Sequence, residues 1–168
     1  MAVADMIGAA VGVILLVIVA YLLVGSVLSI SQTVTSAQKA ATNLEEQQLK
    51  TALAITNTTT EMDQISGMMD INCTVTNTGS EVISDFSQMD IYVYDGGTGN
   101  FYLYHYTAAA GTPGTWTILE RGTGIVHSRE MDPGETYRIL VQTTGTSPEW
   151  FQITTANAVS ASSYLGRG

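Results

Sequence analysis

The chain has only two histidines and one cysteine, the side chains most suited to act as bases or nucleophiles near neutral pH, and they are far apart in the sequence. His105 and His127 lie in segments with the alternation of strands, and neither has a partner at a motif spacing. The patterns G-x-S-x-G, H-E-x-x-H and the phosphate-binding loop are absent from the sequence. The pair Glu45 and Glu46 falls in a helical segment, where exposed charge is the ordinary role. The sequence therefore predicts a protein that is not an enzyme, with no catalytic or cofactor-binding residue.

Metal and thiol chemistry have no better support. A single cysteine excludes an intramolecular disulfide, and no Cys/His cluster has the spacing of a zinc or iron–sulfur site. Cys73 alternates with Ile71 and Val75, which indicates a small buried side chain. Asp95 opens the glycine-rich segment 95–100, and together with Asp90 it leaves a calcium site open as the alternative to a simple turn. We expect the turn, and we expect no bound metal.

Two asparagines have the acceptor pattern for an N-linked glycan, Asn57-Thr58-Thr59 and Asn72-Cys73-Thr74. The pattern has a meaning only where this part of the chain is exported from the cell. Asn57 and Asn72 are therefore candidate glycosylation sites on condition of export.

Composition limits the partners of the chain. Its 168 residues carry six Lys+Arg against fifteen Asp+Glu, a formal net charge of −9. Such a surface repels phosphate backbones, so we expect no nucleic-acid partner. Only 12 % of the residues are charged. This is about half the usual share, so part of the chain avoids water or its surface is built from uncharged polar groups.

The first fifty residues form a segment of their own. Residues 6–38 contain no charged residue, and Met6–Val24 is an apolar run of 19 residues. About 20 such residues span the hydrocarbon core of a bilayer. No proline interrupts residues 1–50, and Glu46 precedes Lys50 by four positions, so we predict one continuous helix over residues 1–50. A signal peptide is disfavoured, because Asp5 is the only early charge and the apolar run is too long.

Two details favour a helix that packs against other helices. Gly8 and Gly12 form a G-x-x-x-G spacing, which lets helix backbones approach closely. The span also lacks the basic flank expected of an anchor with an exported C-terminal domain. We therefore expect that a basic leader preceded Met1 and was removed, although a plain membrane anchor remains the alternative.

Residues 51–168 have the pattern of an all-β domain. Short alternating segments are predicted as strands at 70–76, 89–94, 101–106, 115–119, 124–127, 137–142 and 150–154, and Asp132-Pro133-Gly134-Glu135 is predicted as a turn. Strands separated by turns, with no long amphipathic helix between them, indicate an antiparallel, immunoglobulin-like β-sandwich. The predicted fold class is therefore α+β, a long apolar helix (1–50) followed by a β-sandwich (51–168).

Aromatic residues gather on one predicted hairpin of this domain. Alternation puts Tyr102, Tyr104 and Tyr106 on the same face of a strand, with Trp116 nearby in the sequence. Such a stripe either supports the edge of the core or forms a contact with another subunit, since tyrosine is enriched at interfaces.

An uncharged apolar helix at the N-terminus with a lone acid at Asp5, which continues into a polar helical half and a Thr-rich β domain, resembles the type IV pilin superfamily. Its archaeal members, the archaellins and archaeal adhesion pilins, are the most similar. The resemblance implies a structural subunit of an extracellular filament, an archaellum for motility or a pilus for adhesion. It also implies an inner-membrane precursor, a prepilin-type peptidase and an assembly motor.

The predicted partner of the chain is itself, in a helical homopolymer. The residues expected to carry assembly are Gly8, Gly12 and Gly25 for close packing, Ile14, Leu15, Leu16, Ile18 and Leu22 for core contact, and Asp5 for pairing with a neighbouring N-terminal amine. The alternative is a membrane-anchored archaellum accessory protein, whose β-sandwich binds the S-layer or envelope as a static anchor.

Overall fold

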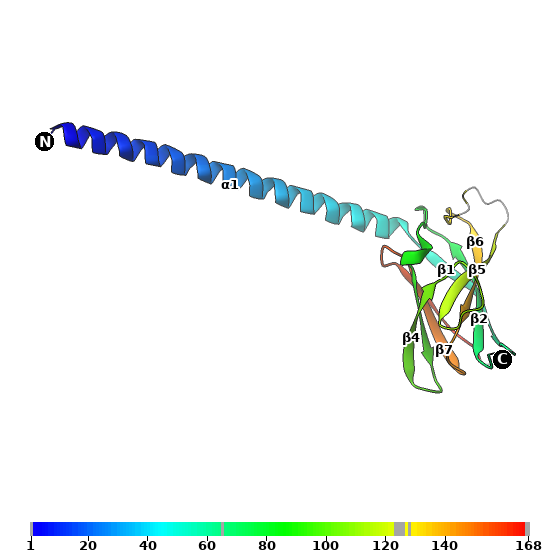
Figure 1. The fold of residues 1–168 in the computed structure, drawn as a ribbon. Helices are drawn as coiled ribbons and strands as arrows, with labels where there is room; N and C mark the ends of the chain where they lie inside the picture. The colour runs from blue at the N-terminus through cyan, green and yellow to red at the C-terminus, as the bar shows by residue number, and fades with distance from the viewer. Residues whose placement is uncertain (1, 65, 123–126, 128, 167–168) are drawn as a thin grey trace. The chain divides into compact units, whose positions relative to one another are not determined.

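The protein forms two compact units, residues 1–44 and residues 45–168. The computed structural model describes residues 2–64, 66–122, 127 and 129–166, without the side chains of Ala2 and Asp5. One helix, α1, extends from Ala2 to Lys50 without a break (Figure 1). Its sequence lacks proline and is rich in alanine, leucine, isoleucine and valine, so the hydrogen-bond ladder continues for about 74 Å at 1.5 Å per residue.

The second unit contains eight strands after the last turn of α1. The strands are β1 (Leu53–Met62), β2 (Met69–Asn77), β3 (Asp90–Asp95), β4 (Asn100–Tyr106), β5 (Thr115–Arg121), β6 (Thr136–Gln142), β7 (Pro148–Thr154) and β8 (Ser160–Tyr164). A short 3-10 helix, η1, covers Phe86–Gln88 before β3.

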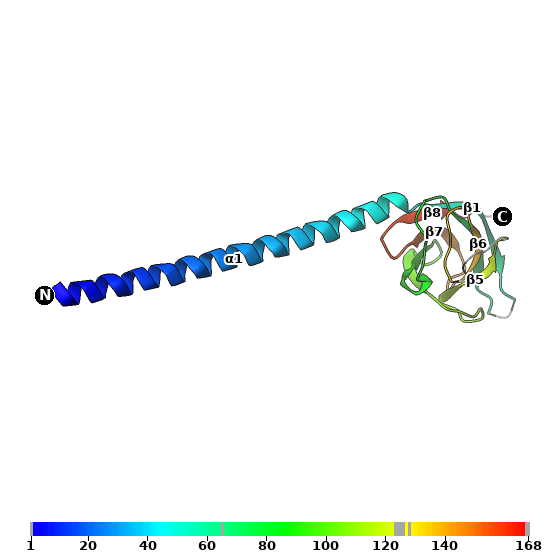
Figure 2. The ribbon, with the colours of Figure 1, turned by 90° about the horizontal axis from the view of Figure 1, so that it is seen from above.

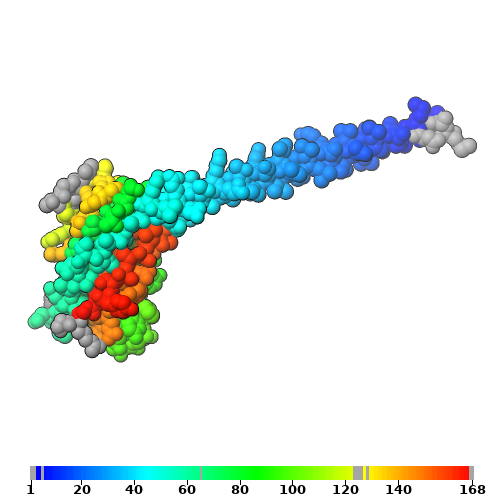
Figure 3. Space-filling model, turned by 180° about the vertical axis from the view of Figure 1, so that it is seen from behind, coloured from blue at the N-terminus to red at the C-terminus, as the bar shows by residue number. Residues whose placement is uncertain are grey.

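These strands form two layers. One contains β1, β2, β6 and β5 in that order, and the other contains β4, β3, β7 and β8. Seen from above, β7 and β8 lie on one side and β1, β5 and β6 on the other (Figure 2). At one edge of the sandwich the two layers are joined, because β4 pairs with β5. At the other edge β1 and β8 lie side by side (Figure 3). The predicted α+β fold, with a long helix before a β-sandwich, is confirmed.

The pairing of β4 with β5 departs from the prediction of an antiparallel sandwich. These two strands run parallel, with Tyr106 opposite Trp116. Residues 107–114 connect the two strands, and only the last two residues of β4 pair with the first two of β5. The remaining pairs of named strands are antiparallel.

Most of the predicted strands are found within one to two residues of their expected ends. The turn at residues 132–135 is confirmed, because the Glu135 N–H donates to the Asp132 carbonyl at 3.0 Å. The strand predicted at 124–127 falls largely outside the described residues. Strands β1 and β8 are present although the sequence pattern did not predict them.

The core lies between the two layers. Every second residue of β2, β3 and β7 points inward, and the buried set includes Ile71, Cys73, Val75, Ile91, Val93, Phe151 and Ile153. Cys73 is 1 % exposed. Burial raises the pKa of its thiol far above the ordinary value, so Cys73 is an inert core residue, as predicted.

Candidate assembly surfaces

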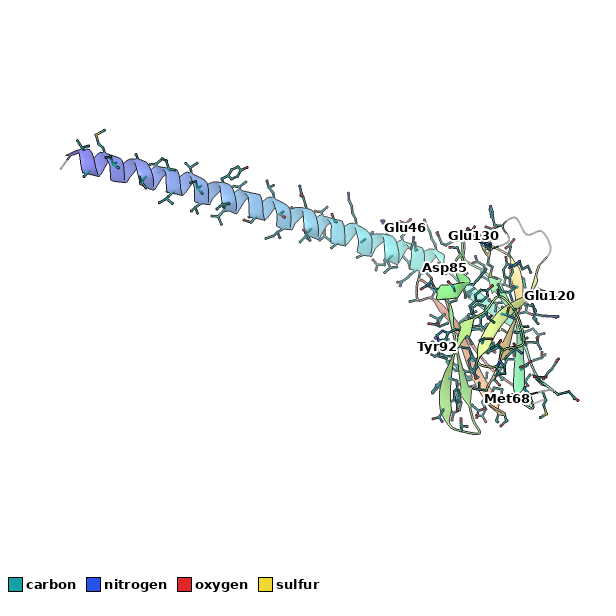
Figure 4. The ribbon with its side chains drawn as sticks, viewed as in Figure 1. Glu46, Met68, Asp85, Tyr92, Glu120 and Glu130 are labelled. Carbon is teal, nitrogen blue, oxygen red and sulfur yellow. The ribbon has the colours of Figure 1, made fainter. Side chains whose placement is uncertain are left out.

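The apolar surface of α1 is uncovered on every side. Its large apolar side chains project all round the helix (Figure 4), and the predicted core-contact residues Ile14, Leu15, Leu16, Ile18 and Leu22 are 50–71 % exposed. The stretch from Met6 onward is long and apolar enough to cross a membrane. A helix of this kind is stable only in lipid or among other apolar helices.

The three glycines of α1 are not required by the fold of the single chain. A Cβ added at Gly8, Gly12 or Gly25 would meet nothing within 4 Å outside the local helix. Glycine inside a helix costs about 1 kcal/mol relative to alanine. Gly8 and Gly12 are four residues apart and therefore share one face. The destabilising glycine pair thus forms a smooth strip, where a neighbouring helix can approach closely.

Three hydroxyl groups in the middle of α1 donate hydrogen bonds within the helix. Ser26 Oγ donates to the Leu22 carbonyl at 2.5 Å, Thr33 Oγ1 donates to Ser29 at 3.0 Å, and Thr35 Oγ1 donates to Ser31 at 2.8 Å. A hydroxyl that is already paired can enter apolar surroundings without losing a hydrogen bond to water. The part of α1 that an apolar environment can accommodate therefore extends beyond the apolar run Met6–Val24.

The last turn of α1 is fixed within the second unit. Gln48 Nε2 donates to the Asn157 carbonyl at 2.9 Å, and Asn157 Nδ2 donates to Thr51 Oγ1 at 2.7 Å. The Lys50 carbonyl, which has no partner in the helix, accepts the Ser80 N–H at 2.8 Å. A Cβ at Gly79 would overlap the Lys50 carbonyl oxygen and the Ala52 nitrogen, so this close approach needs glycine.

The glycine-rich tip between β3 and β4 is a structural turn. The two carboxylate oxygens of Asp95 accept the N–H groups of Thr98 at 2.8 Å and Ser147 at 2.9 Å. Burial raises the pKa of Asp95, but these backbone hydrogen bonds outweigh it and hold the pKa below its ordinary value. Asp90 points to the opposite face of β3, so the two acids do not meet in a calcium site, and the turn interpretation holds.

The two glycosylation sequences face each other across paired strands. Asn57 of β1 lies opposite Thr74 of β2, and Thr59 lies opposite Asn72. Together with Glu61 and Arg138, these four residues line a polar groove. Asn57 is exposed on the edge strand β1, whereas Asn72 is half-buried between β1 and β6. The sequence alone gave no reason to rank them, because this difference arises from strand order.

The aromatic stripe, for which the sequence leaves a core-edge and a subunit-contact role open, lies toward the core. Tyr104 and Trp116 are each 1 % exposed, and Tyr102 and Tyr106 are half-buried against the core. Tyr106 packs edge-on against Trp116, with ring centroids 5.0 Å apart. The core-edge alternative therefore describes these four residues, and Tyr104 and Trp116 are too buried for contact with another subunit.

The opposite face of the same strands carries aromatic residues that the sequence analysis missed. Phe101 of β4, Tyr94 of β3, Trp150 of β7 and Tyr164 of β8 line an open hollow on the outer surface. Tyr94 and Phe101 belong to predicted strands. Because Phe101 directly precedes Tyr102, alternation places these two side chains on opposite faces of the strand, and this was the signal in the sequence for a second aromatic face.

The histidines have acidic neighbours in the structure. His105 Nδ1 lies 3.6 Å from Asp90 Oδ1, and His127 Nδ1 lies 3.1 Å from Asp132 Oδ2. The group of His127, Glu130 and Asp132 brings three potential metal ligands within 4.8 Å of one another. His127 is exposed and the two acids are half-buried, an arrangement that surface ion pairs adopt without a metal.

The chain thus combines an exposed apolar helix with a β-sandwich. The family model for archaeal-type flagellin matches residues 4–163. The chain belongs to this family, and it is a structural subunit of an archaeal flagellar filament, a surface appendage of the cell.

Solved structures share the fold at low sequence identity. The archaeal flagellum of Methanospirillum hungatei strain JF1 is 14 % identical, with a TM-score of 0.61 over 96 % of this chain and 94 % of that one. Archaeal flagellin FlaB1 of Methanocaldococcus jannaschii is 15 % identical, with a TM-score of 0.50 over 68 % and 88 %. The archaellum periplasmic stator protein FlaG of Sulfolobus acidocaldarius is 20 % identical, with a TM-score of 0.47 over 67 % and 97 %. None of the curated proteins matches the chain.

Proposed function

We propose that copies of this chain polymerise by bundling their α1 helices, so that the apolar surface of each helix is covered by its neighbours. The observation that carries the proposal is that the exposed large apolar side chains of α1 are 48–84 % exposed in the single chain. Residues 6–38 carry no charge, a length of about 50 Å. This exceeds the roughly 30 Å hydrocarbon core of a bilayer, so the uncharged stretch is longer than a simple anchor needs.

Gly8, Gly12 and Gly25 provide the close-packing positions in this proposal, and Ile14, Leu15, Leu16, Ile18 and Leu22 fill the bundle. The glycines lower the intrinsic stability of the helix and meet no neighbour within the chain, which supports a role between chains. The prediction that Asp5 pairs with a neighbouring N-terminal amine concerns a side chain outside the described part of the chain, and it stays a prediction.

Assembly exchanges one apolar environment for another. Before assembly α1 lies in the membrane, and afterwards it lies in the dry centre of the bundle. Lipid tails are as apolar as leucine, so apolar burial gives little drive for this transfer. We infer that a separate membrane motor supplies the work and that a prepilin-type peptidase is a further partner of the chain.

The β domains face solvent in the proposed filament. Their acidic composition and the exposed Asn57 suit this position, and Asn57 is proposed to carry an N-linked glycan. Repeated contacts that do not close on themselves give a helical polymer. Motility is the proposed role of the filament, in keeping with the family, and adhesion is the second role that such a filament serves.

The test is to shear cells that express the chain and to image the detergent-free material by negative-stain electron microscopy. Peptide mass spectrometry then identifies the subunit of any filament. We expect abundant filaments that contain this chain, including peptides from residues 6–38. Recovery of the chain only in membranes would favour the static anchor and contradict the proposal.

A further inference from the structure

Four aromatic residues form a single row across the outer face of the β4-β3-β7-β8 layer. Tyr94 lies directly opposite Phe101 on one side and Trp150 on the other, and Trp150 lies opposite Tyr164. The ring centroids of Tyr94 and Phe101 are 5.0 Å apart, and those of Phe101 and Trp150 are 6.0 Å apart in an edge-on arrangement. The row is thus built by strand register and not by chance proximity.

The two ends of the row are exposed, and Tyr94 and Trp150 between them are half-buried. Phe101 is 66 % exposed and Tyr164 is 82 % exposed, in contrast to the buried Tyr104 on the inner face. An aromatic side chain carries about 150–250 Å2 of surface, so these two residues alone present about 300 Å2. A stable, independent complex covers about 800 Å2 on each partner. The row is too small for a stable dimer but suits a contact that a polymer repeats many times.

Few charges lie near the row: Asp90, on the outer face of β3, is two register rows away beside His105, and Glu149 precedes Trp150 in the chain. The next register row consists of Leu103, Tyr92, Gln152 and Ser162, all uncharged, and Figure 4 marks Tyr92 beside β4. The outer face of the other layer carries Glu61, Arg138 and Glu120. Because each chain has a net charge of −9, two β domains approach at lower cost through a face with few charges.

We propose that the row of Phe101, Tyr94, Trp150 and Tyr164 is a contact with the β domain of a second copy of this chain in the filament. The inference rests on the proposed function, because only in a polymer does so small a surface gain strength from repetition. It adds a second contact, distinct from the bundled helices, that ties the outer domains together.

Fluorescence provides the first test, since the chain has two tryptophans and Trp116 is buried in the single chain. In a Trp116→Phe background, Trp150 is the sole reporter. We expect its emission to shift to shorter wavelength, and acrylamide quenching to decrease, in filaments relative to detergent-dispersed full-length chains. Equal emission and quenching in the two states would overturn the inference while leaving the filament itself intact. A wild-type chain that forms no filament would overturn the proposed function and the inference together.

A second test uses matched exposed residues in the otherwise wild-type chain. Phe101→Ser and Met62→Ser remove apolar side chains of similar exposure, 66 % and 63 %, from different strands. We expect Phe101→Ser filaments to release chains at a lower temperature than wild-type filaments, and Met62→Ser filaments to match the wild type. Equal release temperatures for all three would contradict the contact. A glycan is the other occupant that the tests can reveal. If Trp150 is already protected from acrylamide in dispersed chains, and this protection is lost in the double variant Asn57→Gln, Asn72→Gln, a glycan covers the row and the proposal is overturned.

Discussion

Asp95 and Ser147 are joined across the end of the sandwich, where Asp95 Oδ2 accepts the Ser147 N–H at 2.9 Å and the Ser147 carbonyl accepts the Gly96 N–H at 2.8 Å. The pair connects the β3–β4 tip to the segment before β7. Asp95 is 2 % exposed, so its carboxylate is a buried charge held by backbone donors.

Replacing this carboxylate should destabilise the β domain. In Asp95→Asn an NH2 group replaces one of the two oxygens that accept the backbone N–H groups of Thr98 and Ser147. An NH2 group cannot accept, so at least one buried hydrogen bond is lost, at a cost of about 2 kcal/mol. Unfolding of the full-length chain in detergent, followed by the fluorescence of Trp116 and Trp150, measures the loss. Asp85→Asn is the matched control, because Asp85 is exposed and its positive φ of 57° is one that asparagine tolerates. Equal stability of the two variants would contradict the assigned role of Asp95.

The lowered pKa of Asp95 predicts a contribution to acid stability with a definite sign. Above about pH 4 the group is charged in both the folded and the unfolded chain, and its full contribution is present. Below about pH 4 the unfolded chain takes up a proton first, so stability is lost as the pH falls through the folded-state pKa. We expect unfolding curves of Asp95→Asn to depend less on pH in this range than those of the wild type. If the wild type and Asp95→Asn lose stability equally as the pH falls, Asp95 does not contribute to the pH dependence.

The junction after α1 offers a steric prediction. Gly79→Ala places a Cβ against the Lys50 carbonyl oxygen and the Ala52 nitrogen, both of which are backbone atoms. The segment must shift, and the hydrogen bond from the Ser80 N–H to Lys50 weakens, at a cost of about 1–3 kcal/mol. Thermal unfolding should show a lower midpoint for Gly79→Ala. Gly166→Ala, where a Cβ meets nothing within 4 Å, should leave the midpoint unchanged.

Strand order predicts which asparagine carries a glycan. Asn57 is exposed on an edge strand, whereas Asn72 is half-buried on an interior strand whose next residue, Cys73, is in the core. Intact-mass measurement of exported chains should show that Asn57→Gln removes the glycan mass and that Asn72→Gln retains it. The reverse pattern would indicate that modification precedes folding of the β1–β2 pair.

The structure also explains which features the sequence pattern predicted and which it did not. The helix followed from an uncharged, proline-free start, and β2 followed from the strict alternation around Cys73. Strand β1 contains four threonines and little apolar alternation, and β8 consists largely of serine, so both depend on pairing with β2 and β7. Strand β4 has aromatic residues on both faces, so its pattern leaves open which face is buried. Pairing with the layer that holds Ile91 and Val93 turns Tyr104 inward and leaves Phe101 outside.

Close packing of α1 is tested by the size of the side chain at Gly12. Gly12→Ala and Gly12→Leu both raise helix propensity, and neither meets another part of the single chain. A loss of filaments therefore reports on contacts between helices and not on the helix itself. We expect a small effect of alanine and a strong loss of sheared filaments with leucine, while the amount of chain in the membrane fraction stays at the wild-type level. Filament yields that are equal for glycine, alanine and leucine would show that no neighbouring helix approaches this strip, and the bundle would then have to pack through other faces of α1.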